Sequence, residues 1–88
     1  MMENPSLIEY PTDFPLKVMG RREPRLVQTI VDIVQKHAPD FDPATVEMRA
    51  SKKNSYLSVT CTIRATSREQ LDALYGELCD HPSVVMVL

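Results

Sequence analysis

Residues 57–65 read LSVTCTIRA, and this stretch decides the fold. Apolar side chains occupy every second position from Leu57 to Ala65, and small polar or charged side chains stand between them. A period of two is that of a β-strand with one buried face and one solvated face. The stretch therefore predicts a half-buried strand, and a slip of one residue would expose its whole apolar set.

A helix is predicted directly after this strand. Thr66 and Glu69 stand three residues apart, as in a capping box at a helix start. Apolar residues then recur at helical spacing through residues 71–78, and the pair His81-Pro82 ends the helix. Residues 84–88 form a short apolar run, which predicts a last strand.

The first half of the chain has the same order of elements. Residues 14–20 alternate between apolar and polar side chains and predict a strand that ends at Gly20. Helical spacing between Pro24 and Pro39 predicts a helix, with Pro24 suited to its first turn. Residues 45–50 alternate again as a second strand, and the polar residues 51–55 predict the tip of a hairpin.

The order β-α-β-β-α-β predicts an α+β protein with a ferredoxin-like sandwich. Right-handed crossovers put the first and third strands at the centre of a four-stranded antiparallel sheet, with two helices on one face. Residues 14–88 form this single domain, and residues 1–13 are expected to be a flexible N-terminal arm. The predicted core comprises Leu16, Val18, Leu26, Ile30, Ile33, Val34, Val46, Met48, Val59, Cys61, Ile63, Leu71, Leu74 and Leu78.

Composition excludes several classes of function. The formal net charge is −2, whereas general affinity for nucleic acid needs an excess of Lys and Arg. No apolar run is long enough to cross a membrane, and the N-terminus has no signal-peptide pattern. Cys61 and Cys79 lack the spacing of a metal site, so we expect two packed, inert thiols in a reducing cytoplasm.

Several motifs taken together resemble the YbeD-like family of small bacterial proteins of unknown function. The most specific are Lys17-Val18-Met19-Gly20 and the ending Met86-Val87-Leu88; others are Tyr10-Pro11, Phe14-Pro15, Ser51-Lys52 and the stretch from Val34 to Pro39. The resemblance implies a ferredoxin-like fold similar to the ACT regulatory domains that bind small ligands. It also implies a loose link to lipoate metabolism. No catalytic residue carries over from the family.

The sequence lacks the motifs of well-known proteins that share this architecture. An acylphosphatase loop would be richer in glycine than residues 20–24, and a metallochaperone would place CxxC there. An RNA-recognition motif needs aromatic residues on its central strands, and strand 57–65 offers Ser58, Thr60 and Thr62 on its open side. His37 and His81 suit helix ends rather than a metal. The acidic residues of the second helix, including Glu77, are expected to be solvated, so we expect no enzyme, cofactor or metal.

One loop has residues that could bind an anion. Gly20, Arg21, Arg22 and Arg25 stand where the first strand meets the first helix, and a helix N-terminus with nearby guanidinium groups attracts carboxylate or phosphate. The alternative interpretation is a solvated charged loop. A second candidate is the open face of the sheet, which carries Lys17, Met19, Arg49, Ser58, Thr60, Thr62 and Arg64, together with Thr45 and Glu47.

Two classes of function remain. The first is a small regulatory or sensor domain that binds a small anionic ligand or a partner protein without catalysis. The second is a protein-interaction adaptor acting through the open sheet face or an edge strand. Residues 84–88 carry no charge, proline or sign of a bulge, so this edge predicts a weak homodimer, unless the arm covers it with Leu7, Ile8 and Tyr10.

Overall fold

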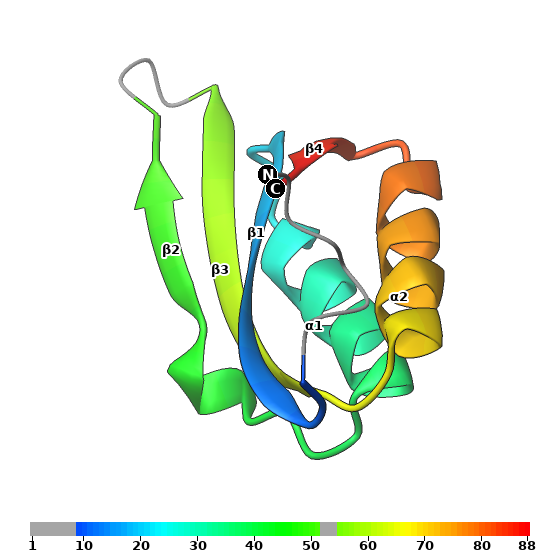
Figure 1. The fold of residues 1–88 in the computed structure, drawn as a ribbon. Coiled ribbons are helices and arrows are strands. Elements are labelled where there is room, and N and C mark those ends of the chain that lie inside the picture. The colour runs from blue at the N-terminus through cyan, green and yellow to red at the C-terminus, as the bar shows by residue number, and fades with distance from the viewer. Residues whose placement is uncertain (1–8, 52–54) are drawn as a thin grey trace, which may run out of the picture.

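The fold is a four-stranded antiparallel sheet with both helices on one face (Figure 1). We describe it from a computed structural model, for residues 9–51 and 55–88. The strand order is β2-β3-β1-β4, so the ferredoxin-like prediction and its central strands are confirmed. In chain order the elements are β1 (Thr12–Arg21), α1 (Leu26–His37), the 3-10 helix η2 (Pro43–Thr45), β2 (Glu47–Ala50), β3 (Tyr56–Ala65), α2 (Arg68–Asp80) and β4 (Val84–Val87).

The starts of β1 and β2 differ from the prediction. β1 begins at Thr12, two residues before the expected start, because Thr12 and Asp13 pair with Ala65 and Arg64 at the end of β3. Thr45 lies in η2 instead of a strand, and its hydroxyl donates to the carbonyl of Asp42 over 2.7 Å. Residues 1–8 of the predicted arm and residues 52–54 of the predicted hairpin tip lie outside the described residues.

The core lies between the central strands and the two helices. Leu16 faces Cys61 and Val18 faces Val59 across the β1–β3 pair, and all four side chains are fully buried. Burial of such a side chain stabilises the fold by about 1.5–3 kcal/mol. Phe41 and Ala38, which follow α1, are also buried, although the sequence did not mark them as core.

The prediction of the core was wrong for one residue and too strong for another. Met48 is 58% exposed, and Val46 is only partly buried against the core. Both lie on or beside β2, an edge strand that pairs with β3 alone. The alternation in residues 45–50 identified the correct face of β2, but the edge strand is not fully covered on that face.

The start of α2 uses the neighbouring residues of the predicted capping box. Ser67 is the N-cap, and its hydroxyl accepts from the backbone N–H of Gln70 over 3.1 Å. The Gln70 side chain in turn accepts from the backbone N–H of Thr66 over 2.7 Å. Ser67 with Gln70 fits the motif as well as Thr66 with Glu69 does, and with Ser67 as the N-cap the helix starts one residue later.

Candidate functional site

The open face of the sheet carries two rows of side chains that run across neighbouring strands. In one row Thr60 of β3 stands between Glu47 of β2 and Lys17 of β1. In the next row Ser58 of β3 stands between Arg49 and Met19, and Met19 pairs onward with Met86 of β4. Opposite residues on one face lie close enough for their side chains to interact. The register therefore places Lys17 and Arg49 on either side of the β3 hydroxyls.

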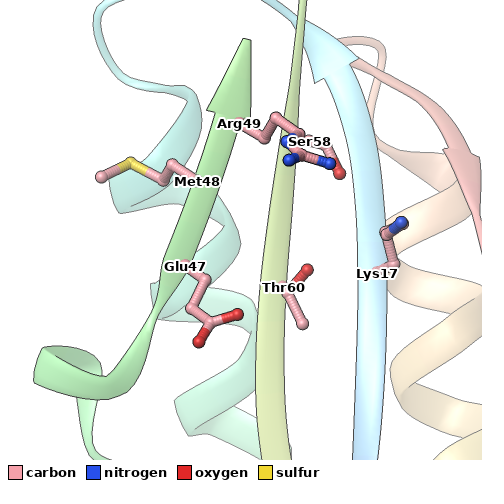
Figure 2. A pocket seen from close by; sticks show the side chains of 6 residues that line it. All are labelled: Lys17, Glu47, Met48, Arg49, Ser58 and Thr60. Carbon is pink, nitrogen blue, oxygen red and sulfur yellow. The ribbon is translucent and has the colours of Figure 1, made fainter.

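A shallow hollow of about 490 Å³ lies over these rows, and its volume falls within the range of small-molecule sites. Figure 2 shows the Arg49 guanidinium reaching over β3 beside Ser58, while the Glu47 carboxylate points toward Thr60. Lys17 stands on the other side of β3, and Met48 points away from the group. The lining residues are Lys17, Glu47, Met48, Arg49, Ser58 and Thr60.

A second, smaller hollow of about 180 Å³ adjoins the first and is lined mainly by apolar atoms. The two hollows share Lys17, Arg49 and Ser58. We call these three residues the cationic corner. The residues that line the smaller hollow alone are Met19, Ala50, Ser51 and Tyr56.

The two cations of the corner differ from Arg64 on the same face. Arg64 is paired with Asp13 directly across the β1–β3 ladder, at 3.3 Å between guanidinium and carboxylate. The ion pairs found within residues 9–51 and 55–88 include neither Lys17 nor Arg49. The corner therefore offers two positive charges and the Ser58 hydroxyl to an anion, on a chain whose net charge is −2.

The predicted anion loop has less to offer a ligand than its sequence suggested. The backbone N–H of Arg21 donates to Ser83 over 2.9 Å, and that of Arg22 donates to Ser55 over 3.2 Å. The N–H of Leu26, at the start of α1, donates to Glu23 over 3.1 Å. The Arg21, Arg22 and Arg25 side chains are exposed. Three backbone donors of this loop, including the first N–H of α1, are thus already engaged.

Gly20 has a packing role in this loop. A Cβ at Gly20 would lie 2.7 Å from both the Ser83 carbonyl oxygen and a methyl group of Leu26. The absence of a side chain lets β1 approach the turn before β4 and the start of α1 closely. The glycine is therefore explained by packing without any ligand.

The two predicted helix-end histidines have structural partners. His37 Nε2 lies 2.8 Å from Glu77 Oε1, and Lys36 Nζ lies 3.1 Å from Glu77 Oε2, so Glu77 joins α1 to α2. These hydrogen bonds, from His37 first and then from Lys36, lower the pKa of Glu77. The Glu77 side chain is 34% exposed, so it is partly solvated, as predicted, and is also paired with α1. His81 Nδ1 accepts from the backbone N–H of Ser83 over 3.1 Å.

The two cysteines differ, and the prediction of two buried thiols was wrong for one of them. Cys61 is fully buried in β3, and this burial raises the pKa of its thiol to about 11. Cys79 is exposed near the end of α2. Within residues 9–51 and 55–88, no three His, Cys, Asp or Glu side chains group together as metal ligands would.

Tyr56 is an aromatic residue of the open face that the site prediction missed. It begins β3, shares the face of Ser58 and Thr60 by the period of two, and is 43% exposed. Its backbone is held by Ser51, whose N–H donates to the Tyr56 carbonyl and whose hydroxyl accepts from the Tyr56 N–H. The alternation of residues 57–65, continued by one position, would have placed this aromatic ring on the open face.

A family model described as protein of unknown function, DUF493, matches residues 5–88. The chain belongs to this family. Among similar proteins, a UPF0250 protein of Nitrosomonas europaea is 55% identical over 99% of this chain and 100% of its own length. A UPF0250 protein of Bordetella pertussis is 59% identical over 94% of this chain and 91% of its own length. The resemblance to the YbeD-like small bacterial proteins is confirmed.

Solved structures similar to this DUF493 protein have ACT-like folds. The solution structure of protein HP0495 from H. pylori has a TM-score of 0.75 at 15% identity, over 100% of this chain and 98% of that one. The ACT domain from GTP pyrophosphokinase of Chlorobium tepidum has a TM-score of 0.64 at 18% identity, over 86% of this chain and 84% of that one. These likenesses establish the fold of the DUF493 domain. In the part of the chain that the structure describes, neither helix has the length and apolar character needed to cross a membrane.

Proposed function

We propose that this chain is a small regulatory or sensor domain that binds an anionic group, without catalysis, at the cationic corner of its open sheet face. The observation that carries the proposal is the placement of Lys17 and Arg49 on either side of Ser58, in a hollow on an acidic chain. Guanidinium and ammonium groups bind carboxylate and phosphate through charge-assisted hydrogen bonds. The ACT-like fold supports a regulatory role by analogy alone.

Composition also bears on the class of ligand and on the compartment in which the domain acts. We do not expect nucleic acid to be the ligand, because the chain is acidic. RNA-recognition motifs use several aromatic side chains to stack bases, whereas the described part of the open face carries one, Tyr56. It places the domain in the cytoplasm, where unpaired thiols such as the exposed Cys79 stay reduced. The link to lipoate metabolism is a hypothesis about which anion binds, and lipoate therefore belongs among the ligands tested.

The proposal predicts which amides respond to anions in an NMR titration at constant ionic strength. Inorganic phosphate, acetate and lipoate would serve as probes, and the responding amides should be those of Lys17, Arg49, Ser58 and Thr60. Replacing Lys17 and Arg49 together by Gln keeps much of both side-chain stems and removes both charges, so the shifts should fall at least tenfold.

Two control variants separate the candidate sites. Arg68→Gln removes another exposed guanidinium from α2, on the far side of the sheet, and should leave the shifts unchanged. Arg22→Ala with Arg25→Ala should also leave them unchanged. If this second variant alone abolished the response, the anion would bind at the loop between β1 and α1 and the open face would be the wrong site.

A second candidate function, an adaptor that pairs through β4, is favoured by the exposed apolar side chains of that edge. Val85 and Met86 are about half exposed, and Leu88 is 62% exposed. Lys17 and Leu88 exchange both backbone hydrogen bonds, so the N–H and C=O of Val87 point away from β1, toward an added strand. The register between β1 and β4 shifts at Met19 and Gly20, however, so the prediction of an edge without a bulge was wrong. Such an irregularity makes an edge less ready to pair.

Sedimentation of the full chain tests this candidate. Pairing through β4 predicts a weak dimer that dissociates in Val85→Lys, because a charge in a strand-to-strand contact opposes association. Arg68→Glu, on α2, would be the control and should leave the dimer intact. A native chain that stays monomeric at millimolar concentration would exclude β4 pairing between copies.

A further inference from the structure

The smaller hollow bears on what kind of anion would bind. It adjoins the cationic corner, and the residues that line it alone are Met19, Ala50, Ser51 and Tyr56, of which Met19 and Tyr56 have large side chains on the open face. Met19 is partly buried and Tyr56 is 43% exposed, so both present apolar surface to solvent beside the charges. An anion held at the corner would therefore have an apolar surface next to it on one side.

The larger hollow differs on its other side. Glu47 and Thr60 line it but do not line the smaller hollow. Strands in a sheet lie about 4.8 Å apart, so the Glu47 carboxylate, on β2, stands within a few side-chain lengths of the corner. A second negative charge on a ligand would meet this carboxylate if it extended toward Thr60. The two sides of the corner are thus chemically unlike.

From these contrasts we propose that the ligand is a small amphipathic monoanion, whose charged group binds at Lys17, Arg49 and Ser58 and whose apolar group packs on Tyr56 and Met19. This inference rests on the proposed function. The volume of the smaller hollow, about 180 Å³, suits one ring or a short branched chain; an apolar cavity of about 150 Å³ can bind benzene.

Three probes separate the parts of this inference. Acetate carries the charge alone, 2-phenylethanol carries the ring alone, and phenylacetate carries both. In NMR titrations at constant ionic strength, phenylacetate should bind at least tenfold more tightly than acetate, and 2-phenylethanol should bind more weakly than phenylacetate. The amides of Met19 and Tyr56 should shift with phenylacetate but not with acetate.

Variants of the smaller hollow provide matched controls. Tyr56→Thr keeps a β-forming residue at an exposed position and should reduce the affinity for phenylacetate to that for acetate. Met86→Thr changes an exposed side chain on the same face but outside both hollows, and should change neither affinity. Phenylsuccinate, a dianion, should bind more weakly than phenylacetate, and Glu47→Gln should reduce that difference.

The outcomes distinguish the inference from the proposed function. If acetate binds through Lys17 and Arg49 but phenylacetate binds no better, the amphipathic ligand is wrong and the anion site stands. If phenylacetate binds equally well after both cations are replaced by Gln, the contact is apolar only and the inference is overturned. If neither acetate, phosphate nor phenylacetate shifts the corner amides, the inference fails together with the proposed function.

Discussion

Ile63→Ala should lower the free energy of unfolding by about 2–5 kcal/mol, through lost apolar burial and a residual cavity. Ile63 is 1% exposed on the central strand β3. Small domains have total stabilities of about 5–15 kcal/mol, so this single change would unfold a large fraction of the molecules under mild denaturant. Urea unfolding followed by circular dichroism measures the shift in midpoint.

Met48→Ala is the matched control, because the sequence marks both residues as core and the structure separates them. Met48 is 58% exposed on the edge strand β2, and we expect its replacement to change the free energy of unfolding by less than about 1 kcal/mol. Equal losses at the two positions would mean that β2 is covered on the helix side. An unchanged urea midpoint for Ile63→Ala would contradict the central, buried position of β3 in the sheet.

Gly20→Ala should destabilise the domain by about 1–3 kcal/mol, the usual cost of overpacking. The added Cβ would lie 2.7 Å from the Ser83 carbonyl oxygen, which accepts from Arg21, so the backbone itself would have to move. The displacement falls on the contact between β1 and the turn that leads into β4. Hydrogen exchange should therefore show faster exchange in β4 and at Arg21 than at the centre of β3.

Gly76→Ala is the control for this substitution, because nothing lies within 4 Å of a Cβ added at Gly76. Gly76 is inside α2, where alanine is favoured over glycine by about 0.5–1 kcal/mol, so this variant should be stabilised. We therefore expect Gly20→Ala to lower the free energy of unfolding and Gly76→Ala to raise it. If Gly20→Ala were neutral as well, the close approach of Ser83 to β1 would not constrain the fold, and a ligand role for Gly20 would regain support.

Much of the fold could be predicted from local patterns. The period of two in residues 57–65 identified the buried face of β3, and the two helical stripes identified α1 and α2, because periodicity records which side of an element meets the core. Element boundaries were less certain. Thr66 with Glu69 and Ser67 with Gln70 both fit a helix start, and the structure has Ser67 as the N-cap, with its hydroxyl bound to the Gln70 N–H.

The candidate site was harder to predict, because it is assembled from three strands. Lys17, Arg49, Ser58 and Thr60 were all placed on the open face by alternation. Alternation alone does not give the register, and the register makes Lys17 and Arg49 flank the β3 hydroxyls. The three arginines of the loop form a continuous motif that the sequence alone can show. The partners of the loop's backbone N–H groups are Ser83, Ser55 and Glu23, and the first two are far away in sequence, so the motif could not predict them.

The sequence by itself determined the order of the elements, the faces of the central strands and most of the core, since each follows from the spacing of apolar residues along one element. Only the tertiary structure decided how far each position is covered. Met48 has the pattern of a buried residue, yet it is exposed on an edge strand, and Cys79, which we expected to be packed, is exposed on α2. Coverage depends on which neighbour lies alongside, and that neighbour comes from elsewhere in the chain.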